Sequence, residues 1–212
     1  MQDKSEISGY RWKGAELTSA HDYLLPALLE ELDRAKIDVI GNKRIFELGC
    51  GNGSVANILA QKGWDVSGVD PSSDGIAQAN ATYPHLDLRQ GSAYDDLVSH
   101  YGKFPIVTSL EVVEHVYAPR HYAATLYSLV QSGGTAIIST PYHSYWKNLA
   151  LALTGKMDAH FTALWDHGHN KFWSTTTLSH LLQEAGFKDI RFRRVGRIPP
   201  LAKSMIAIVR KP

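Results

Sequence analysis

A buried-strand pattern that runs directly into a cluster of glycines constrains the fold of this chain more than any other feature. Arg44–Leu48 is short and mostly apolar, and Gly49-Cys50-Gly51-Asn52-Gly53 follows it without a spacer. The amphipathic stretch 54–62 comes next, so the sequence predicts a strand, a tight turn and a helix. Glycines permit left-handed backbone angles and let a ligand approach the backbone closely. This order is typical of a doubly wound α/β fold, whose ligands bind beyond the carboxyl ends of the strands.

Short apolar runs alternate with amphipathic stretches along most of the chain, which indicates a parallel sheet with helices between its strands. Beyond Thr140 the alternation stops, and the inserted segment 141–170 is expected to form a lid. A helix near Thr175–Ala185 then leads to two strands whose short connection makes them antiparallel. We expect a Rossmann-like α/β fold: a doubly wound, seven-stranded, mostly parallel sheet with a final antiparallel hairpin and helices on both faces. The expected strands are Arg44–Leu48, Asp65–Asp70, Leu86–Gln90, Phe104–Leu110, Thr135–Thr140, Asp189–Val195 and Lys203–Val209.

The size and charge of the chain favour one domain without a nucleic-acid partner. Its 212 residues suffice for one sizeable core, so 1–212 is expected to form a single domain. Within it, 1–40 should form helices over the site, and Pro26 is well placed to begin the second of two helices in Ala15–Ala35. Lys+Arg number 22 against 21 Asp+Glu, which supplies no overall field for DNA or bulk RNA. The single cysteine, and the lack of a signal pattern or long apolar run, predict a cytoplasmic protein that does not span a membrane.

Two acidic residues indicate which ligand the glycine-rich turn binds. Asp70 ends the second expected strand, where a carboxylate can accept both hydroxyls of a ribose. Glu47 precedes the turn, and its charge would repel a pyrophosphate but suits a sulfonium and an α-amino group. Ala56 also stands where a dinucleotide-binding turn would need a third glycine. These features favour S-adenosylmethionine (SAM) over NAD.

The Glu-Leu-Gly-Cys-Gly-Asn-Gly turn resembles that of the class I SAM-dependent methyltransferases, and the resemblance extends over about 45–209. It implies that the ribose-binding acid is Asp70 and that Gly91-Ser92-Ala93 lies beside the adenine. The cofactor-binding residues expected on this basis are Glu47, Gly49, Cys50, Gly51, Gly53, Asp70, Pro71, Ser92, Ala93, Leu110 and Glu111.

Three ionisable side chains, Glu111, Glu114 and His115, follow the fourth expected strand and should lie beside the cofactor. If this stretch turns helically, their i, i+3, i+4 spacing puts them on one face. Two carboxylates close together repel each other and need a positive charge nearby. A divalent cation would supply it, and two carboxylates with one imidazole suit Mg²⁺, Mn²⁺ or Zn²⁺. In the alternative interpretation, Glu111 caps backbone amides or contacts the cofactor, Glu114 is a solvated helix residue and His115 packs at the sheet edge.

The same stretch, Glu-Val-Val-Glu-His-Val, and the later Ser139-Thr140-Pro141 resemble the ubiquinone-biosynthesis O-methyltransferases. The resemblance implies a metal motif, carried over to Glu111, Glu114 and His115, and an additional histidine shortly before Lys171-Phe172. His167 and His169 are both candidates for it, and His167 has the better spacing. The small-RNA 2′-O-methyltransferases share a similar arrangement, so the motif favours an oxygen acceptor without choosing the substrate. A phenolic acceptor must lose its proton, and His115 and His143 are the candidate proton acceptors; alternatively, His143 is a loop histidine.

Three functions are therefore compared. The first is O-methylation of a small aromatic or quinone-precursor hydroxyl, and the second is 2′-O-methylation of RNA. The third is a non-catalytic SAM-binding module, which would not need the acidic acceptor end. Arg191, Arg193, Arg194 and Arg197 invite an RNA interpretation, but Arg191 and Arg193 lie on one face of a strand, and such residues are more often simply solvated. Tyr10, Trp12 and Tyr23 are either part of the acceptor pocket or core.

The inserted segment carries an apolar stripe of Trp146, Leu149, Ala150 and Leu153 at helical spacing. Such a stripe in a domain of this size is expected to pack on the core. The alternative is a lid whose segment 144–165, with Phe161 and Trp165, touches a bilayer interface peripherally while an isoprenoid-tailed substrate enters.

Overall fold

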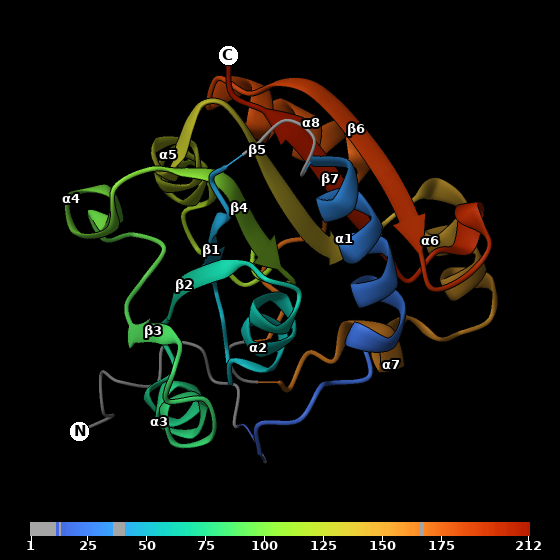
Figure 1. Ribbon diagram of the computed structural model, residues 1–212. Helices are drawn as coiled ribbons and strands as arrows, with labels where there is room; N and C mark the ends of the chain where they lie inside the picture. Colours follow the sequence, from blue (N-terminus) through green and yellow to red (C-terminus); the bar gives the residue numbers. More distant parts are fainter. Residues whose placement is uncertain (1–11, 13, 36–40, 166–167) are drawn as a thin grey trace.

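The computed structural model describes residue 12 and residues 14–35, 41–165 and 168–212. Within these ranges a seven-stranded sheet has the order β3-β2-β1-β4-β5-β7-β6 (Figure 1). All neighbours are parallel except β7, which runs antiparallel to both β5 and β6. The expected fold class is confirmed. The strands are β1 Arg44–Leu48, β2 Asp65–Asp70, β3 Asp87–Gln90, β4 Phe104–Leu110, β5 Val130–Pro141, β6 Lys188–Val195 and β7 Ser204–Arg210.

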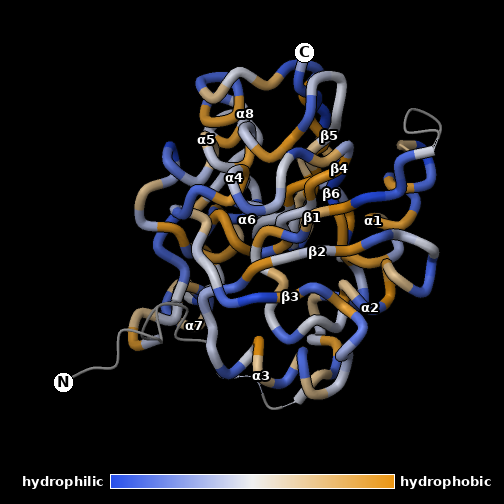
Figure 2. The backbone as a smooth tube through the Cα atoms, turned by 60° about the vertical axis from the view of Figure 1, so that its left-hand side comes forward, coloured by the Kyte–Doolittle hydropathy of each residue, from blue (hydrophilic) through white to orange (hydrophobic). Residues whose placement is uncertain are grey.

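Helices cover both faces of the sheet because side chains alternate across each strand. Ile45 on β1 packs in the core under α1, α2 and α3, whereas its neighbour Phe46 packs in the core under α4, α5 and α8. Figure 2 shows apolar residues gathered along the central strands. The helices are α1 His21–Ala35, α2 Ser54–Gln61, α3 Ser73–Thr82, α4 Leu97–Tyr101, α5 Pro119–Leu129, α6 Tyr145–Leu153, α7 Met157–Phe161 and α8 Thr175–Glu184, with a 3₁₀ turn, η1, at Pro199–Leu201.

The N-terminal helices differ from the prediction, because Pro26 does not begin a second helix. It lies inside one continuous helix, α1. Proline removes the N–H that would reach the Asp22 carbonyl four residues earlier. Pro26 is on the exposed side of α1, where water can satisfy that carbonyl, while Leu24, Leu28 and Leu32 are buried against the sheet. Burial of this apolar face explains why the helix continues through the proline.

The inserted segment leaves the sheet after β5, contains α6 and α7, and returns to the place where it left. Its ends meet where Tyr142 bridges Trp173 and where the His143 amide donates to the Trp173 carbonyl. No residue of α6 is buried, and Trp146 and Leu153 are 64% and 79% exposed. The expectation that this apolar stripe packs on the core is therefore wrong. No helix among the described residues is both long and apolar enough to cross a bilayer.

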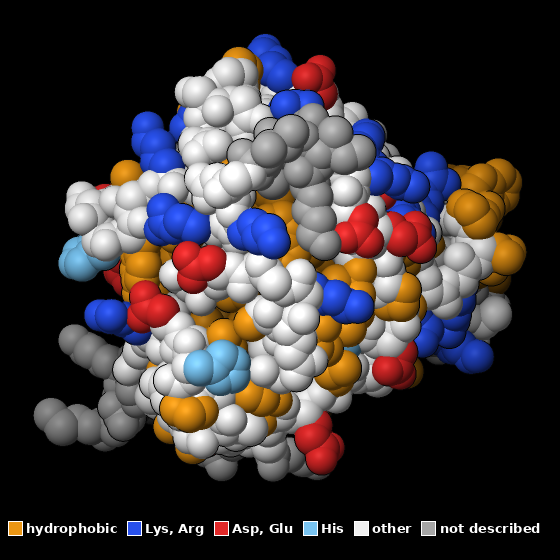
Figure 3. Space-filling view, viewed as in Figure 1, with side chains coloured by type: hydrophobic (Ala, Val, Ile, Leu, Met, Phe, Trp, Pro, Cys, Tyr) orange, Lys and Arg blue, Asp and Glu red, His pale blue; other side chains and the backbone are white. Residues whose placement is uncertain are grey.

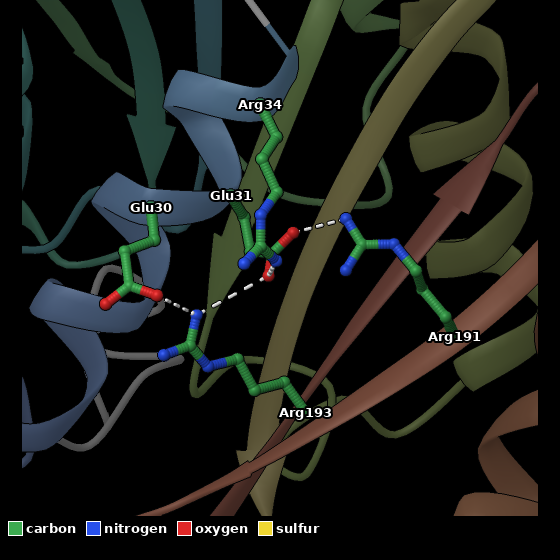
Figure 4. A network of polar contacts seen from close by, with 5 residues as sticks. All are labelled: Glu30, Glu31, Arg34, Arg191 and Arg193. Atoms are coloured by element: carbon green, nitrogen blue, oxygen red, sulfur yellow. Dashed lines mark hydrogen bonds and ion pairs between the residues drawn. The ribbon is translucent and has the colours of Figure 1, made fainter.

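A charged network joins α1 to β6 (Figure 4). Arg191 donates to the buried carboxylate of Glu31, which also accepts from Arg34 at 2.7 Å. Arg193 bonds Glu30 at 2.6 Å and lies 3.5 Å from Glu31. Burial alone would raise the pKa of Glu31, but the three guanidinium groups hold it below its ordinary value. Arg191 and Arg193 thus dock α1 on the sheet, which corrects the interpretation that they are simply solvated.

We expect Glu31→Gln to lower the free energy of unfolding at pH 7 by about 1–3 kcal/mol, because it removes charge-assisted hydrogen bonds. Because the pKa of Glu31 is lowered in the folded state, its contribution is present above the unfolded value and is lost as the pH falls through the folded value. The difference between variant and wild type in urea unfolding should therefore shrink on acidification. Glu30→Gln, which alters an exposed pair, is the control and should change stability much less. An equal loss in both variants, independent of pH, would contradict this account.

Candidate active site

A cavity of about 590 Å³ lies at the carboxyl ends of the parallel strands. This size is ordinary for a small-molecule site. All but one of the residues expected to bind the cofactor line it, namely Glu47, Gly49, Cys50, Gly51, Asp70, Pro71, Ser92, Ala93, Leu110 and Glu111. The strand periodicity and the turn thus place these residues together, as the sequence predicts.

The glycine-rich turn needs its glycines for two different reasons. Gly49, Gly51 and Gly53 all have positive φ. A Cβ at Gly49 would lie 2.3 Å from Val112, and one at Gly53 would lie 2.8 Å from Leu88. Gly53 is the exception among the expected cofactor residues, because it does not line the cavity and instead lets α2 begin close to Leu88 and α3.

The Asp70 carboxylate is fixed by the backbone of the neighbouring turns. It accepts from the Gly51 amide at 2.9 Å and from the Ser72 amide at 2.8 Å, one bond to each oxygen. Burial raises the pKa of Asp70, while these two amides oppose the rise. Each carboxylate oxygen keeps a second acceptor position, so the group can also accept the hydroxyls of a ribose.

Glu47 is 2% exposed, and its Oε2 has no hydrogen-bond partner among the described residues. Burial, and then the nearby charge of Asp70, raise its pKa to about 8. Glu47 is therefore mostly protonated at neutral pH in the ligand-free protein. A cationic ligand would favour the ionised form, because an opposite charge stabilises a carboxylate.

The stretch after β4 is a turn and not the helix that the i, i+3, i+4 argument assumed. Glu111 has φ +53°, a left-handed angle that a helix cannot continue through. Its carboxylate accepts from Ser139 at 2.8 Å and from Ser204 at 3.4 Å. Burial raises the pKa of Glu111 to about 7, against the opposing effects of both serines and of Lys147. Glu111 lines the cavity but is not part of the cluster formed by its neighbours.

That cluster consists of Glu114, His115 and His169, whose ligating atoms all lie within 4.8 Å of one another. The fourth residue expected for a metal, His167, lies outside the described residues. His169, the other candidate before Lys171, is brought to the cluster by its chain neighbours, since the amides of Asn170 and Lys171 donate to the Glu114 carbonyl at 2.8 and 3.0 Å. Spacing alone could not choose between two histidines separated by one glycine.

The cluster has the types of side chain that bind divalent metal ions. Glu114 is 1% exposed, and neither of its carboxylate oxygens has a partner among the described residues. Burial, and then Glu111, raise its pKa well above the ordinary value. Burial and the neighbouring His115 lower the pKa of His169 to about 4, so its imidazole is neutral at pH 7, as a metal ligand must be. The potential ligand atoms of Glu114, His115 and His169 therefore converge at the cavity wall.

His143 lies elsewhere, although the sequence suggested a place beside the acceptor. It does not line the cavity and is 5% exposed among His160, Phe161 and Phe172, whose ring centroids lie 5.1–5.9 Å away. Burial, and then Lys147, lower its pKa to about 4. The structure thus places His143 in the packing under the insertion.

The structure also places two aromatic residues in the cavity wall: Tyr117, which no sequence motif marked, and Trp165, which the sequence suggested only as part of a lid. Trp165 and Tyr117 line the outer cavity, and Tyr117 is 85% exposed. The Trp165 ring is 5.8 Å from His115 and 5.3 Å from His169, centroid to centroid. Of the N-terminal aromatics, Trp12 lines the cavity, Tyr23 bonds Ser204 at 3.4 Å and Tyr10 lies outside the described residues.

Comparison with known proteins agrees with this geometry. Residues 17–191 match the family model of a methyltransferase domain. The ubiquinone biosynthesis O-methyltransferase of Aromatoleum aromaticum is 27% identical over 194 residues, which cover 89% of this chain and 81% of that protein. The enzyme of the same name from Burkholderia pseudomallei is 26% identical over 208 residues, covering 96% and 88%.

Among solved structures, the magnesium protoporphyrin IX methyltransferase from Synechocystis, crystallised with bound S-adenosylhomocysteine (SAH), is similar in fold. Its TM-score is 0.65 at 18% identity, with 87% of this chain and 83% of that chain covered. A SAM-dependent methyltransferase from Archaeoglobus fulgidus gives a TM-score of 0.64 at 16% identity, covering 89% and 93%.

The raised pKa of Glu47 predicts that binding of SAM releases protons and tightens as the pH rises toward about 8, because only the ionised carboxylate attracts the cationic ligand. Calorimetry in two buffers of different protonation enthalpy measures the release. Glu47→Gln should reduce it, and any remainder would report on Glu111, whose pKa is about 7. Equal proton release by wild type and Glu47→Gln would contradict the prediction.

Proposed function

The chain belongs to the methyltransferase-domain family and is a SAM-dependent methyltransferase; on that premise we propose that it methylates a hydroxyl oxygen of a small aromatic, quinone-precursor molecule with the help of a divalent cation. The observation that carries the proposal is the buried Glu114 carboxylate with both oxygens unpartnered among the described residues, next to two imidazoles. A buried charge without compensation is unstable. A cation beside it would remove that instability.

The residues present fit a metal ion. One carboxylate and two imidazoles are a donor set found at catalytic zinc and related transition-metal sites, where open positions remain for a ligand. The set of Glu114, His115 and His169 favours Mn²⁺ or Zn²⁺ over Mg²⁺, which prefers oxygen ligands. When bound, such an ion would lower the pKa of a coordinated hydroxyl and stabilise the resulting oxyanion.

The chain's own residues would align the two substrates. Methyl transfer from a sulfonium is an in-line displacement, so its rate depends on how well donor and acceptor are held. Glu47 and Asp70 would hold the cofactor at the inner end of the cavity, while Tyr117 and Trp165 offer flat apolar faces to an aromatic acceptor at the outer end. His115, whose ring centroid lies 5.8 Å from that of Trp165 and 4.9 Å from that of His169, would bind the cation or take the phenolic proton.

The competing functions find less support. An RNA acceptor would use a basic surface, but Arg191 and Arg193 bond Glu31 and Glu30 and hold α1 in place. A module that only binds SAM would have no use for the cluster around Glu114, whose burial is costly. A small phenolic acceptor therefore fits this site best.

The names of the relatives lead to a second part of the proposal, that the insertion rests on a membrane surface while a lipid-tailed acceptor enters. The α6 patch, which we define as Tyr145, Trp146, Leu153 and Ile198, is 64–79% exposed. Ser144, which caps α6, donates to the Pro200 carbonyl of η1 and so joins the two parts of the patch. Figure 3 shows hydrophobic side chains next to Lys and Arg at the edge where Figure 1 places α6. Exposed aromatic and aliphatic groups bordered by cations suit a bilayer interface.

We expect purified protein to transfer a radiolabelled methyl group from SAM to a dihydroxylated aromatic acid, and EDTA to abolish the transfer until Mn²⁺ or Zn²⁺ is restored. Glu114→Gln and His169→Ala should each lower the rate by roughly two orders of magnitude because a ligand is lost. Both variants should bind SAH as the wild type does, since neither residue belongs to the glycine-rich turn.

The matched control for that assay is His85→Ala, which removes an exposed histidine in the loop before β3. It should keep full activity. Mn²⁺ or Zn²⁺ should raise the melting temperature of wild type and His85→Ala but not of Glu114→Gln. Full activity of the wild type in metal-free buffer would refute the metal, and methylation of RNA but of no phenol would refute the acceptor.

For the α6 patch, we expect weak, reversible co-sedimentation with liposomes that contain anionic lipids. Trp146→Ser with Leu153→Ser should reduce the bound fraction several-fold, because it removes exposed apolar area, and should leave SAH affinity unchanged. Leu17→Ser, which changes an exposed leucine outside the insertion, is the control and should sediment like the wild type. Wild-type protein that never sediments with vesicles would refute the membrane contact.

A further inference from the structure

The described residues of the segment before α1 lie across the glycine-rich turn and are held there by side chains. We call its described part, Trp12 and 14–20, the strap. The Asn52 carboxamide donates to the carbonyls of Gly14 and Glu16 at 2.7 and 2.9 Å. Asn52 is 1% exposed and occupies the variable position of the turn. The turn that faces the cofactor therefore also fixes the strap.

Helix α3 fixes the strap from the other side. Gln78 donates to the Trp12 carbonyl at 2.7 Å, and Asp74 accepts from the Trp12 amide at 3.2 Å. The hydroxyl of Tyr83, which directly follows the helix, donates to the Ala15 carbonyl at 2.9 Å. Gln78 and Tyr83 do not line the cavity, and both bond the backbone of the strap.

The Trp12 indole lies directly on two glycines. A Cβ at Gly51 would come within 2.3 Å of the ring, and a Cβ at Gly75 within 2.8 Å of it. Both contacts are closer than real Cβ atoms tolerate, so glycine at these positions lets the indole lie flat on the backbone. Trp12 and strap residues Thr18, Ser19 and Ala20 line the cavity together with Gly51 and Asp70.

From this arrangement we propose that Trp12 is a cofactor-positioning residue and that the strap must release from Asn52, Gln78 and Tyr83 before SAM enters or SAH leaves. The indole forms the outer wall at the Asp70 end, where the ribose hydroxyls would be accepted. Closing that wall excludes water from the charged hydrogen bonds of Asp70 and so strengthens them. The proposal requires only cofactor binding and is independent of the acceptor and of the metal.

The test measures dissociation of radiolabelled SAH from the full chain. Tyr83→Phe removes one hydroxyl but keeps the ring that packs near Gly53, and Gln78→Ala removes the bond to Trp12. Each should speed dissociation by roughly two- to tenfold, the equivalent of one lost hydrogen bond. Together they should act more strongly than either alone, because both hold the same segment.

Tyr127→Phe on α5, whose ring packs on Phe187 far along the chain from the strap, is the matched control and should leave the rate unchanged. Trp12→Phe should remove part of the tryptophan fluorescence change that SAH causes in the wild type. Two results together would overturn the proposal, even if methyl transfer to phenols is confirmed. SAH would dissociate from Tyr83→Phe and Gln78→Ala at the wild-type rate, and the fluorescence change that SAH causes would be the same in Trp12→Phe as in the wild type.

Discussion

The burial of carboxylates at one edge of the sheet is the constraint on which the rest of the structure depends. Glu47, Asp70, Glu111 and Glu114 end or follow strands β1, β2 and β4, and parallel strands bring their carboxyl ends to the same edge. Burial raises the pKa of all four. No Lys or Arg among the described residues forms a close ion pair with any of them. Such a site is stable in protonated form or with cationic ligands, and a sulfonium donor and a divalent ion are both cations.

The scaffold holds these acids through the backbone and so leaves lone pairs free for ligands. Asp70 is fixed by two amides, and the turn that carries Glu114 is fixed by four groups of residues 170–173: two backbone amides, the Asn170 carboxamide and an indole. One of these is the Trp173 indole, which donates to the Val113 carbonyl at 3.1 Å. These contacts reach the carbonyls of the turn, and neither Glu114 carboxylate oxygen has a close hydrogen-bond partner among the described residues. The end of the insertion and the residues after it therefore position the cluster of Glu114, His115 and His169.

The sequence was sufficient to predict the sheet and to predict that the residues around the glycine-rich turn come together at one cavity. Period-2 and period-3.6 patterns locate the strands, and positions at their carboxyl ends must converge, which is why Glu47 and Asp70 could be assigned from spacing. The acceptor end was less predictable because it depends on single backbone angles. A positive φ at a non-glycine residue, Glu111, has no sequence signal, and it turns a supposed helical face into a turn. The prediction that Pro26 begins a second helix was wrong for a related reason. Burial of the apolar face of α1 outweighed the preference of proline for the start of a helix.

The two ends of the cavity are covered by segments from different parts of the chain, and each cover is attached to the chemistry beneath it. The strap is fixed to Asn52 of the cofactor turn and to α3, whereas the insertion is fixed to the Glu114 turn. Between them, Tyr23 of α1 bonds Ser204, which in turn bonds Glu111. Because the covers are held by different partners, one can open without breaking the hydrogen bonds of the other. The strap beside the glycine-rich turn and the insertion beside the Glu114 turn are therefore held by separate sets of hydrogen bonds.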